Sequence, residues 1–229
     1  MGLEISVGLI ADLRESDPES AEEFAQVFSN VGRVLKVHGL PQHVEPLMCE
    51  SRSWGMFGYA GLHYLRRIAA HLDAGLPLPP PGQGGGASDP LLQAYGEDVL
   101  GKKPALMQRL FNKPPRFARS FDHLIVHSDA EGFYLPQDFP NVLFADEAQV
   151  PGGILGSTPR LLAELERLAQ VIGVPESLQS DSEDLWEAVD AHGEGEARWQ
   201  KYGIESYSCV VLREACRKSL ESGAAIVFH

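Results

Sequence analysis

Apolar residues recur along the chain at two spacings, one typical of strands and the other of helices. Residues 3–13 alternate between apolar and other positions, which predicts a strand. From Pro18 onward apolar residues recur every three or four positions, and Asp17 before Pro18 is a typical helix start. Gly39 is expected to end this helix, because glycine readily adopts the left-handed conformation of a helix C-terminus.

The same periodicities continue through the rest of the chain. Helical spacing recurs over residues 59–72, from residue 90, over 159–172, in part of 180–199 and over 205–222. The stretch 121–136 predicts a β-hairpin, with strands over 121–127 and 133–136 joined by a type I turn from Asp129 to Gly132. Short apolar runs predict further strands over 141–145 and 224–229.

This order of elements predicts an α+β fold. Strands are the minority and the hairpin is antiparallel, so we expect a small mixed or antiparallel sheet with a central hairpin, packed against several helices. The apolar strands at the two chain ends need partners, and we expect them near each other or near the hairpin. The 229 residues predict a single domain over 1–229, with a flexible Pro/Gly-rich loop at 76–88.

Residues 59–72 are expected to form an amphipathic helix. The apolar stripe that should face the core consists of Leu62, Leu65, Ala69 and Leu72. The opposite, solvated side is expected to carry His63, Arg66, Arg67 and Ala70. A His and two Arg on one exposed face could bind an anion. The alternative is an ordinary solvated face whose basic residues form salt bridges with acidic residues of this same chain.

The charge balance narrows the choice of partners. The chain carries 32 Asp and Glu against 19 Lys and Arg, a formal net charge of −13. Such a field repels phosphate backbones and anionic lipids, so we expect no nucleic acid and no membrane among the partners. The basic residues of 100–120 are interpreted as balancing the acidic stretch 181–196. Phe111 and Phe117 among them also fit a nucleic-acid surface, but the net charge argues against it.

The predicted hairpin turn holds the first candidate polar site. His127, Asp129 and Glu131 could converge as metal ligands or as a general acid and base. His123 would lie about 13 Å from His127 along a strand, too far for both to bind one metal. The alternative is that Asp129 caps its own turn, Glu131 faces water and no metal is bound. We favour this alternative and expect no metal and no cofactor.

A glycine-rich stretch before the 159–172 helix is the second candidate. Gly153, Gly156, Ser157 and Thr158 could present backbone N–H groups to an anion. No lysine follows the last glycine, so the stretch is not a P-loop. Ser157 or Thr158 acting as a helix N-cap explains the pattern without a ligand.

Cysteine usage and the chain start predict a cytoplasmic protein. The three cysteines, Cys49, Cys209 and Cys216, have no CxxC spacing, which argues against a disulfide framework and against structural zinc. The opening residues lack the pattern of a signal peptide. The sequence identifies no catalytic residue and leaves the oligomeric state open.

Four phrases of the sequence carry a resemblance: GLHYLRRIAAHL, HLIVHSDAEGFYLP, GGILGSTPRLLAELERLA and GAAIVFH. Together they resemble a group of uncharacterised bacterial proteins without established activity, which implies a bacterial cytoplasmic origin. By analogy with small acidic immunity proteins, we expect a non-catalytic interaction module with a basic protein partner. The alternative is a small-molecule or metal-dependent enzyme using residues 127–131 and the 152–158 loop.

Overall fold

The computed structural model describes residues 3–82, 86–99, 101, 116–191 and 193–229. Its centre is a six-stranded sheet with strand order β2-β1-β6-β3-β5-β4. The strands are β1 (Glu4–Val7), β2 (Arg52–Gly55), β3 (Gly132–Leu135), β4 (Leu143–Phe144), β5 (Ile154–Ser157) and β6 (Ile226–Phe228). Only the β3–β5 pair is parallel among these pairings. The C-terminal strand β6 pairs with β1 and β3, so the expected meeting of the two chain ends is confirmed.

The described part of the chain also contains nine α-helices, which confirms the α+β class. They are α1 (Leu9–Ser16), α2 (Pro18–Val37), α3 (Gly58–Asp73), α4 (Pro90–Val99), α6 (Asp122–Ile125), α7 (Thr158–Ile172), α8 (Glu183–Asp190), α9 (Arg198–Lys201) and α10 (Gly203–Ser222). Short 3₁₀ turns lie at Gly86–Ser88 and Pro151–Gly153.

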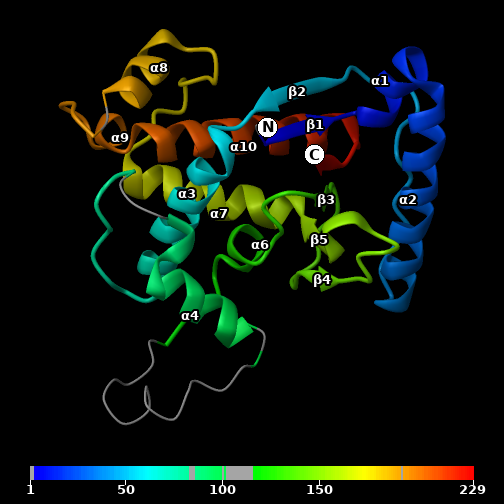
Figure 1. The fold of residues 1–229 in the computed structure, drawn as a ribbon, viewed down its shortest axis with the longest axis horizontal. Helices are drawn as coiled ribbons and strands as arrows, with labels where there is room; N and C mark the ends of the chain where they lie inside the picture. Colours follow the sequence, from blue (N-terminus) through cyan, green and yellow to red (C-terminus); the bar gives the residue numbers. More distant parts are fainter. Residues whose placement is uncertain (1–2, 83–85, 100, 102–115, 192) are drawn as a thin grey trace.

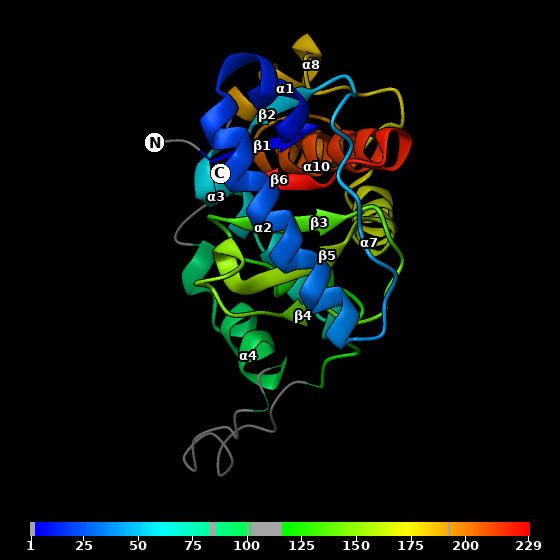
Figure 2. The ribbon, with the colours of Figure 1, turned by 90° about the vertical axis from the view of Figure 1, so that its right-hand side faces the viewer.

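Helices cover both faces of the sheet. Figure 1 shows α10 and α7 running along one face, and Figure 2 shows α2 crossing the other. Alternate residues of β6 contribute to the apolar cores on the two faces of the sheet, because successive side chains of a strand point to opposite faces. Ile226 and Phe228 join the core beneath α3, α7 and α10. Val227 joins the smaller core beneath α2.

Helix starts are where local sequence predicted the structure best. Asp17 accepts a hydrogen bond from the Ser20 N–H at the start of α2, and Ser157 accepts one from the Arg160 N–H at the start of α7. Both helices then carry proline in the first turn, as expected. The strand predicted over 3–13, however, ends at Val7. Gly8 has φ +77 and turns the chain into α1, so the rest of that prediction is wrong.

The predicted central hairpin is wrong in its first half. Residues 121–127 are not a strand, because four of them form the short helix α6 (Asp122–Ile125). The second strand is confirmed as β3, but it pairs with β5 and β6. The alternation of His123, Ile125 and His127 imitates a strand in sequence, whereas distant side chains hold the backbone in a helical turn.

The expected solvated side of α3 is also wrong. Arg66 is 4% exposed, and Arg67 and Ala70 are buried with it. Arg66 can be buried because its donors reach backbone carbonyls, which a hydrophobicity pattern does not register.

Two sequence features extend beyond the described residues. Residues 102–115, with four of the six basic side chains of the 100–120 segment, lie outside them, as do residues 83–85 of the proline-rich loop. Within the described part of that loop, Pro79 accepts a hydrogen bond from the Tyr202 hydroxyl. The mobility of the loop and the single domain stay predictions. Arg119 pairs with Asp122, not with the acidic stretch 181–196.

Candidate functional site

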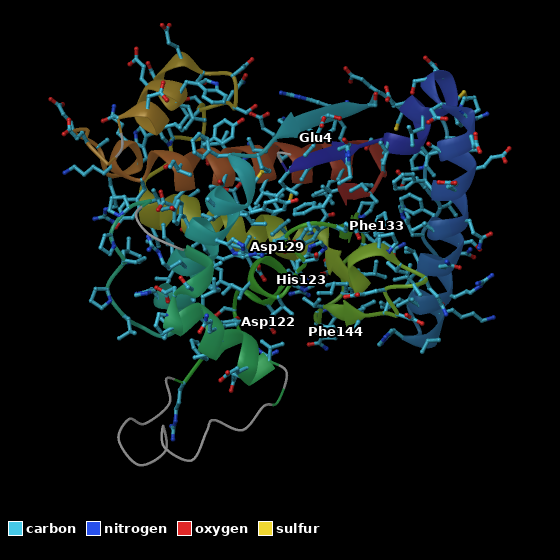
Figure 3. All side chains as sticks on the ribbon, viewed as in Figure 1. Glu4, Asp122, His123, Asp129, Phe133 and Phe144 are labelled. Carbon is cyan, nitrogen blue, oxygen red and sulfur yellow. The ribbon has the colours of Figure 1, made fainter. Side chains whose placement is uncertain are left out.

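Helix α6 is held at its N-terminal side by a buried carboxyl group from α7. Glu164 accepts hydrogen bonds from the backbone N–H groups of His123, at 3.1 Å, and Leu124, at 2.7 Å. Figure 3 shows Asp122 and His123 at the middle of the molecule. Burial raises the pKa of Glu164 to about 8, although its two backbone hydrogen bonds act in the opposite direction.

The other end of α6 is held by Arg66 from α3. Its Nε donates to the Leu124 carbonyl at 2.8 Å, and its Nη2 donates to the carbonyls of His127, at 2.6 Å, and Ser128, at 3.1 Å. One buried guanidinium therefore satisfies three carbonyls of the chain where α6 ends. This positive charge and Glu164 fix α6 from opposite sides.

His127 lies inside the core and not at an exposed tip. Its side chain stacks on the Tyr134 ring at 3.9 Å, and its two ring nitrogens lie 3.0 and 3.1 Å from the carbonyls of Ser128 and Phe133. Burial lowers the pKa of His127 to about 4, although both carbonyls act in the opposite direction; the neutral ring carries one N–H and donates to only one of them. A neutral, enclosed imidazole of this kind packs the core.

Asp129 and Glu131, the other two members of the first candidate site, have separate surroundings. Asp129 Oδ2 lies 2.9 Å from His63 Nε2 on α3, and Glu131 is exposed. The expectation that Asp129 caps its own turn is wrong, since Ser128 Oγ accepts the N–H groups of Ala130 and Glu131. Across the described residues, no group of three or more His, Cys, Asp or Glu side chains is arranged to hold a metal.

The four residues of the second candidate site, Gly153, Gly156, Ser157 and Thr158, make contacts within the fold. Ser157 is fully buried, its N–H donates to His123 Nδ1 at 3.0 Å and its hydroxyl donates to the Gln137 carbonyl. Thr158 is buried beside the Ser219 hydroxyl at 3.4 Å, and the N–H of Gly153 donates to the Val150 carbonyl. Gly156 lies against the Tyr134 ring, where a side chain would collide. The sequence did not indicate that His123 would accept a hydrogen bond from Ser157.

The strongest surface feature is a run of carboxylates on and after α8, here called the α8 acidic surface. It comprises seven exposed residues with no Lys or Arg between them, namely Asp181, Glu183, Asp184, Glu187, Asp190, Glu194 and Glu196. None of the seven forms an ion pair with another residue that the structure describes. Figure 3 shows carboxylate-tipped side chains projecting outward from α8.

A second group of carboxylates, the α1–α2 acidic surface, lies at the other end of the molecule's long axis (Figure 1). It comprises Asp12, Glu15, Asp17, Glu19, Glu22 and Glu23, all exposed, with Arg14 as the one basic residue within 12–23. The carboxylates of the two surfaces, less the positive charge of Arg14, carry a net charge of −12, almost the whole −13 of the chain. From the sequence, the stretch 181–196 was expected only to balance the charge of the basic segment.

Comparison with known protein families places the chain in one family. The model of a family described as "Putative DNA-mimic protein" matches residues 1–228. The chain belongs to this DNA-mimic family. No curated protein and no solved structure matches it.

Membership of the DNA-mimic family confirms the resemblance to a group without established activity and agrees with an interaction protein. It also corrects one expectation. Nucleic acid was excluded because a net charge of −13 repels phosphate. A DNA mimic uses that same negative charge to occupy proteins that bind nucleic acid, so the exclusion is wrong.

Among the helices of the described ranges, none has the length and apolar composition of a membrane span.

Proposed function

We propose that this DNA-mimic protein binds the DNA-contacting surface of a basic protein and thereby excludes DNA from it. The observation that carries the proposal is the α8 acidic surface, whose carboxylates are exposed and unpaired within the described structure. The family description supplies the class of partner, and the basic partner expected from the net charge agrees with it.

The charge spacing along α8 supports this role. Eight residues of α-helix extend about 12 Å. Four carboxylates, those of Glu183, Asp184, Glu187 and Asp190, lie within that length, or about one charge per 3 Å. Measured along the helix axis, one strand of B-DNA presents a phosphate about every 3.4 Å. A row of Lys and Arg side chains placed to bind phosphates would therefore meet a similar density of negative charge on α8.

The helix also presents these charges from a fixed support. Leu185, Ala188 and Val189 are buried on its inner face, and Trp186 contacts the Tyr207 ring of α10 at 4.8 Å between centroids. Residues three and four apart lie on the same side of a helix, so Glu183, Glu187 and Asp190 form one stripe. A rigid stripe loses little conformational entropy on binding.

Carboxylates also reproduce the local chemistry of phosphate. Each can accept two parallel hydrogen bonds from one guanidinium, as a phosphate does. Because the attraction is electrostatic, binding should weaken steeply as salt rises. A DNA-binding partner also agrees with the expected location of the chain in the bacterial cytoplasm, because the bacterial genome lies there.

Affinity capture with a matched pair of variants tests the proposal. In one variant the four acids of α8 become Gln or Asn (E183Q, D184N, E187Q, D190N). In the other, four acids of the α1–α2 acidic surface become Gln (E15Q, E19Q, E22Q, E23Q) with the same change in net charge.

Immobilised wild type and the α1–α2 variant should retain DNA-binding proteins that duplex DNA elutes, whereas the α8 variant should not. Retention by the α8 variant with loss by the α1–α2 variant would contradict the assignment of α8. Captured proteins that hold duplex DNA and this protein together would contradict the mimicry itself.

A further inference from the structure

A cavity of about 210 Å³ opens beside the α8 acidic surface. Its walls come from Ala188 and Val189 of α8, Ile204 and Glu205 of α10, and Pro81 and Gly82 of the proline-rich loop. Most of these walls are apolar. Val189 is followed in the chain by Asp190, so the last turn of α8 both borders the cavity and carries part of the α8 acidic surface.

Glu205 gives this cavity an unsatisfied acceptor. The residue is 1% exposed, and its Oε1 accepts the Gly82 N–H at 2.8 Å. Its Oε2 is buried without a hydrogen-bond partner among the described residues. Leaving a buried acceptor unpaired is unfavourable, and more so when the group is charged. Burial raises the pKa of Glu205, with the charge of Arg67 acting in the opposite direction as a smaller influence.

We propose that this cavity receives the guanidinium of an arginine side chain from the partner's DNA-contacting surface, an inference that rests on the proposed function. The guanidinium would donate to Oε2 of Glu205, while the apolar walls would pack against the methylene groups of the arginine stem. The last turn of α8 borders the cavity, and the C-terminal end of a helix favours a positive charge.

Arginine suits this cavity better than lysine. A guanidinium is less strongly hydrated than an ammonium, so it loses less on entering a cavity with apolar walls. The chain's own Lys201 also lines the cavity, but it forms no ion pair with Glu205 in the described structure. Arginine is also the side chain that DNA-binding surfaces use most for base-specific contacts.

Binding of a small probe to the full-length protein tests the cavity directly. N-acetyl-L-arginine amide is titrated by NMR or calorimetry, with N-acetyl-L-citrulline amide as its uncharged counterpart of similar shape. The arginine probe should bind saturably and the citrulline probe about tenfold more weakly or worse. Absence of saturable arginine binding, or equal binding of citrulline, would overturn the proposal.

Three variants locate the binding. E205Q keeps an oxygen for the Gly82 N–H but removes the charge, and should weaken arginine binding about tenfold. I204F fills the cavity from a partly exposed position and should weaken it similarly without depending on Glu205. E176Q removes one charge from an exposed site outside both acidic surfaces and should leave binding within about twofold of wild type. Unchanged binding of the arginine probe in both E205Q and I204F would contradict its binding in this cavity.

The test separates this inference from the proposed function. If the arginine probe fails to bind while duplex DNA still elutes captured DNA-binding proteins, only the cavity proposal fails. If the probe binds and E205Q abolishes it, but no captured protein is released by DNA, the cavity stands and the mimicry fails.

Discussion

The buried carboxyl of Glu164 makes a quantitative prediction about stability and pH. Its folded-state pKa is raised from 4.5 to about 8 by burial. Between these values the unfolded chain releases the proton while the folded protein keeps it. Folding stability therefore falls as pH rises through this window, because the folded state binds more protons there.

The magnitude follows from the same shift. Each pH unit inside the window costs about 1.4 kcal/mol, so the whole window costs about 5 kcal/mol. E164Q cannot ionise and removes this dependence. It also loses one of the two backbone hydrogen bonds to His123 and Leu124, which costs about 1–3 kcal/mol at every pH.

Urea unfolding of wild type and E164Q from pH 4.5 to 8.5 provides the measurement. The variant should be the less stable protein at pH 5, and its stability relative to wild type should rise by roughly 3–4 kcal/mol between pH 5 and pH 8. E176Q, which loses the same charge from an exposed position, serves as the control. A stability difference between E164Q and wild type that is constant with pH would refute the reasoning.

Three further predictions concern the same core. R66M should lower the free energy of unfolding by roughly 3 kcal/mol in urea, because three carbonyls lose a charged donor; no measurable loss would contradict the assigned contacts. The NMR titration of His127 should have its midpoint near pH 4, so its burial costs stability as pH falls from 6.5 to 4. A midpoint above 6 would contradict burial as the dominant influence on its pKa. Deleting residues 224–229 removes the strand between β1 and β3 and should abolish the cooperative thermal transition; a preserved transition would make the strand peripheral.

Sequence reasoning succeeded where the determining contacts are local. The Asp17 and Ser157 caps lie within three residues of their partners, and both helices begin as predicted. It failed at α6, whose shape depends on Glu164, about forty residues away, and Arg66, about sixty. The prediction for Arg66 failed for the same reason. A residue pattern places a charged side chain in solvent, because the distant carbonyls that bind Arg66 in the core cannot be read from it.

The acidic surfaces could be counted from the sequence but not interpreted. Carboxylates on a solvated helix and carboxylates that imitate phosphates are the same residues at the same spacing. The proposal that they imitate phosphates comes from the family description and not from residue chemistry. Glu205 could not have been identified either, because nothing in its neighbourhood in the chain indicates that Gly82, more than a hundred residues earlier, would share its cavity.

A DNA displacement assay tests the central claim most directly. A DNA-binding protein captured by the wild-type chain is purified and loaded with a fluorescent DNA duplex, and this protein is then titrated into the complex while anisotropy is followed. The account predicts full displacement by wild type, an effect that weakens with added salt, and at least a tenfold higher concentration for the α8 variant. Formation of a ternary complex that retains the duplex, or equal displacement by the α8 variant, would contradict it.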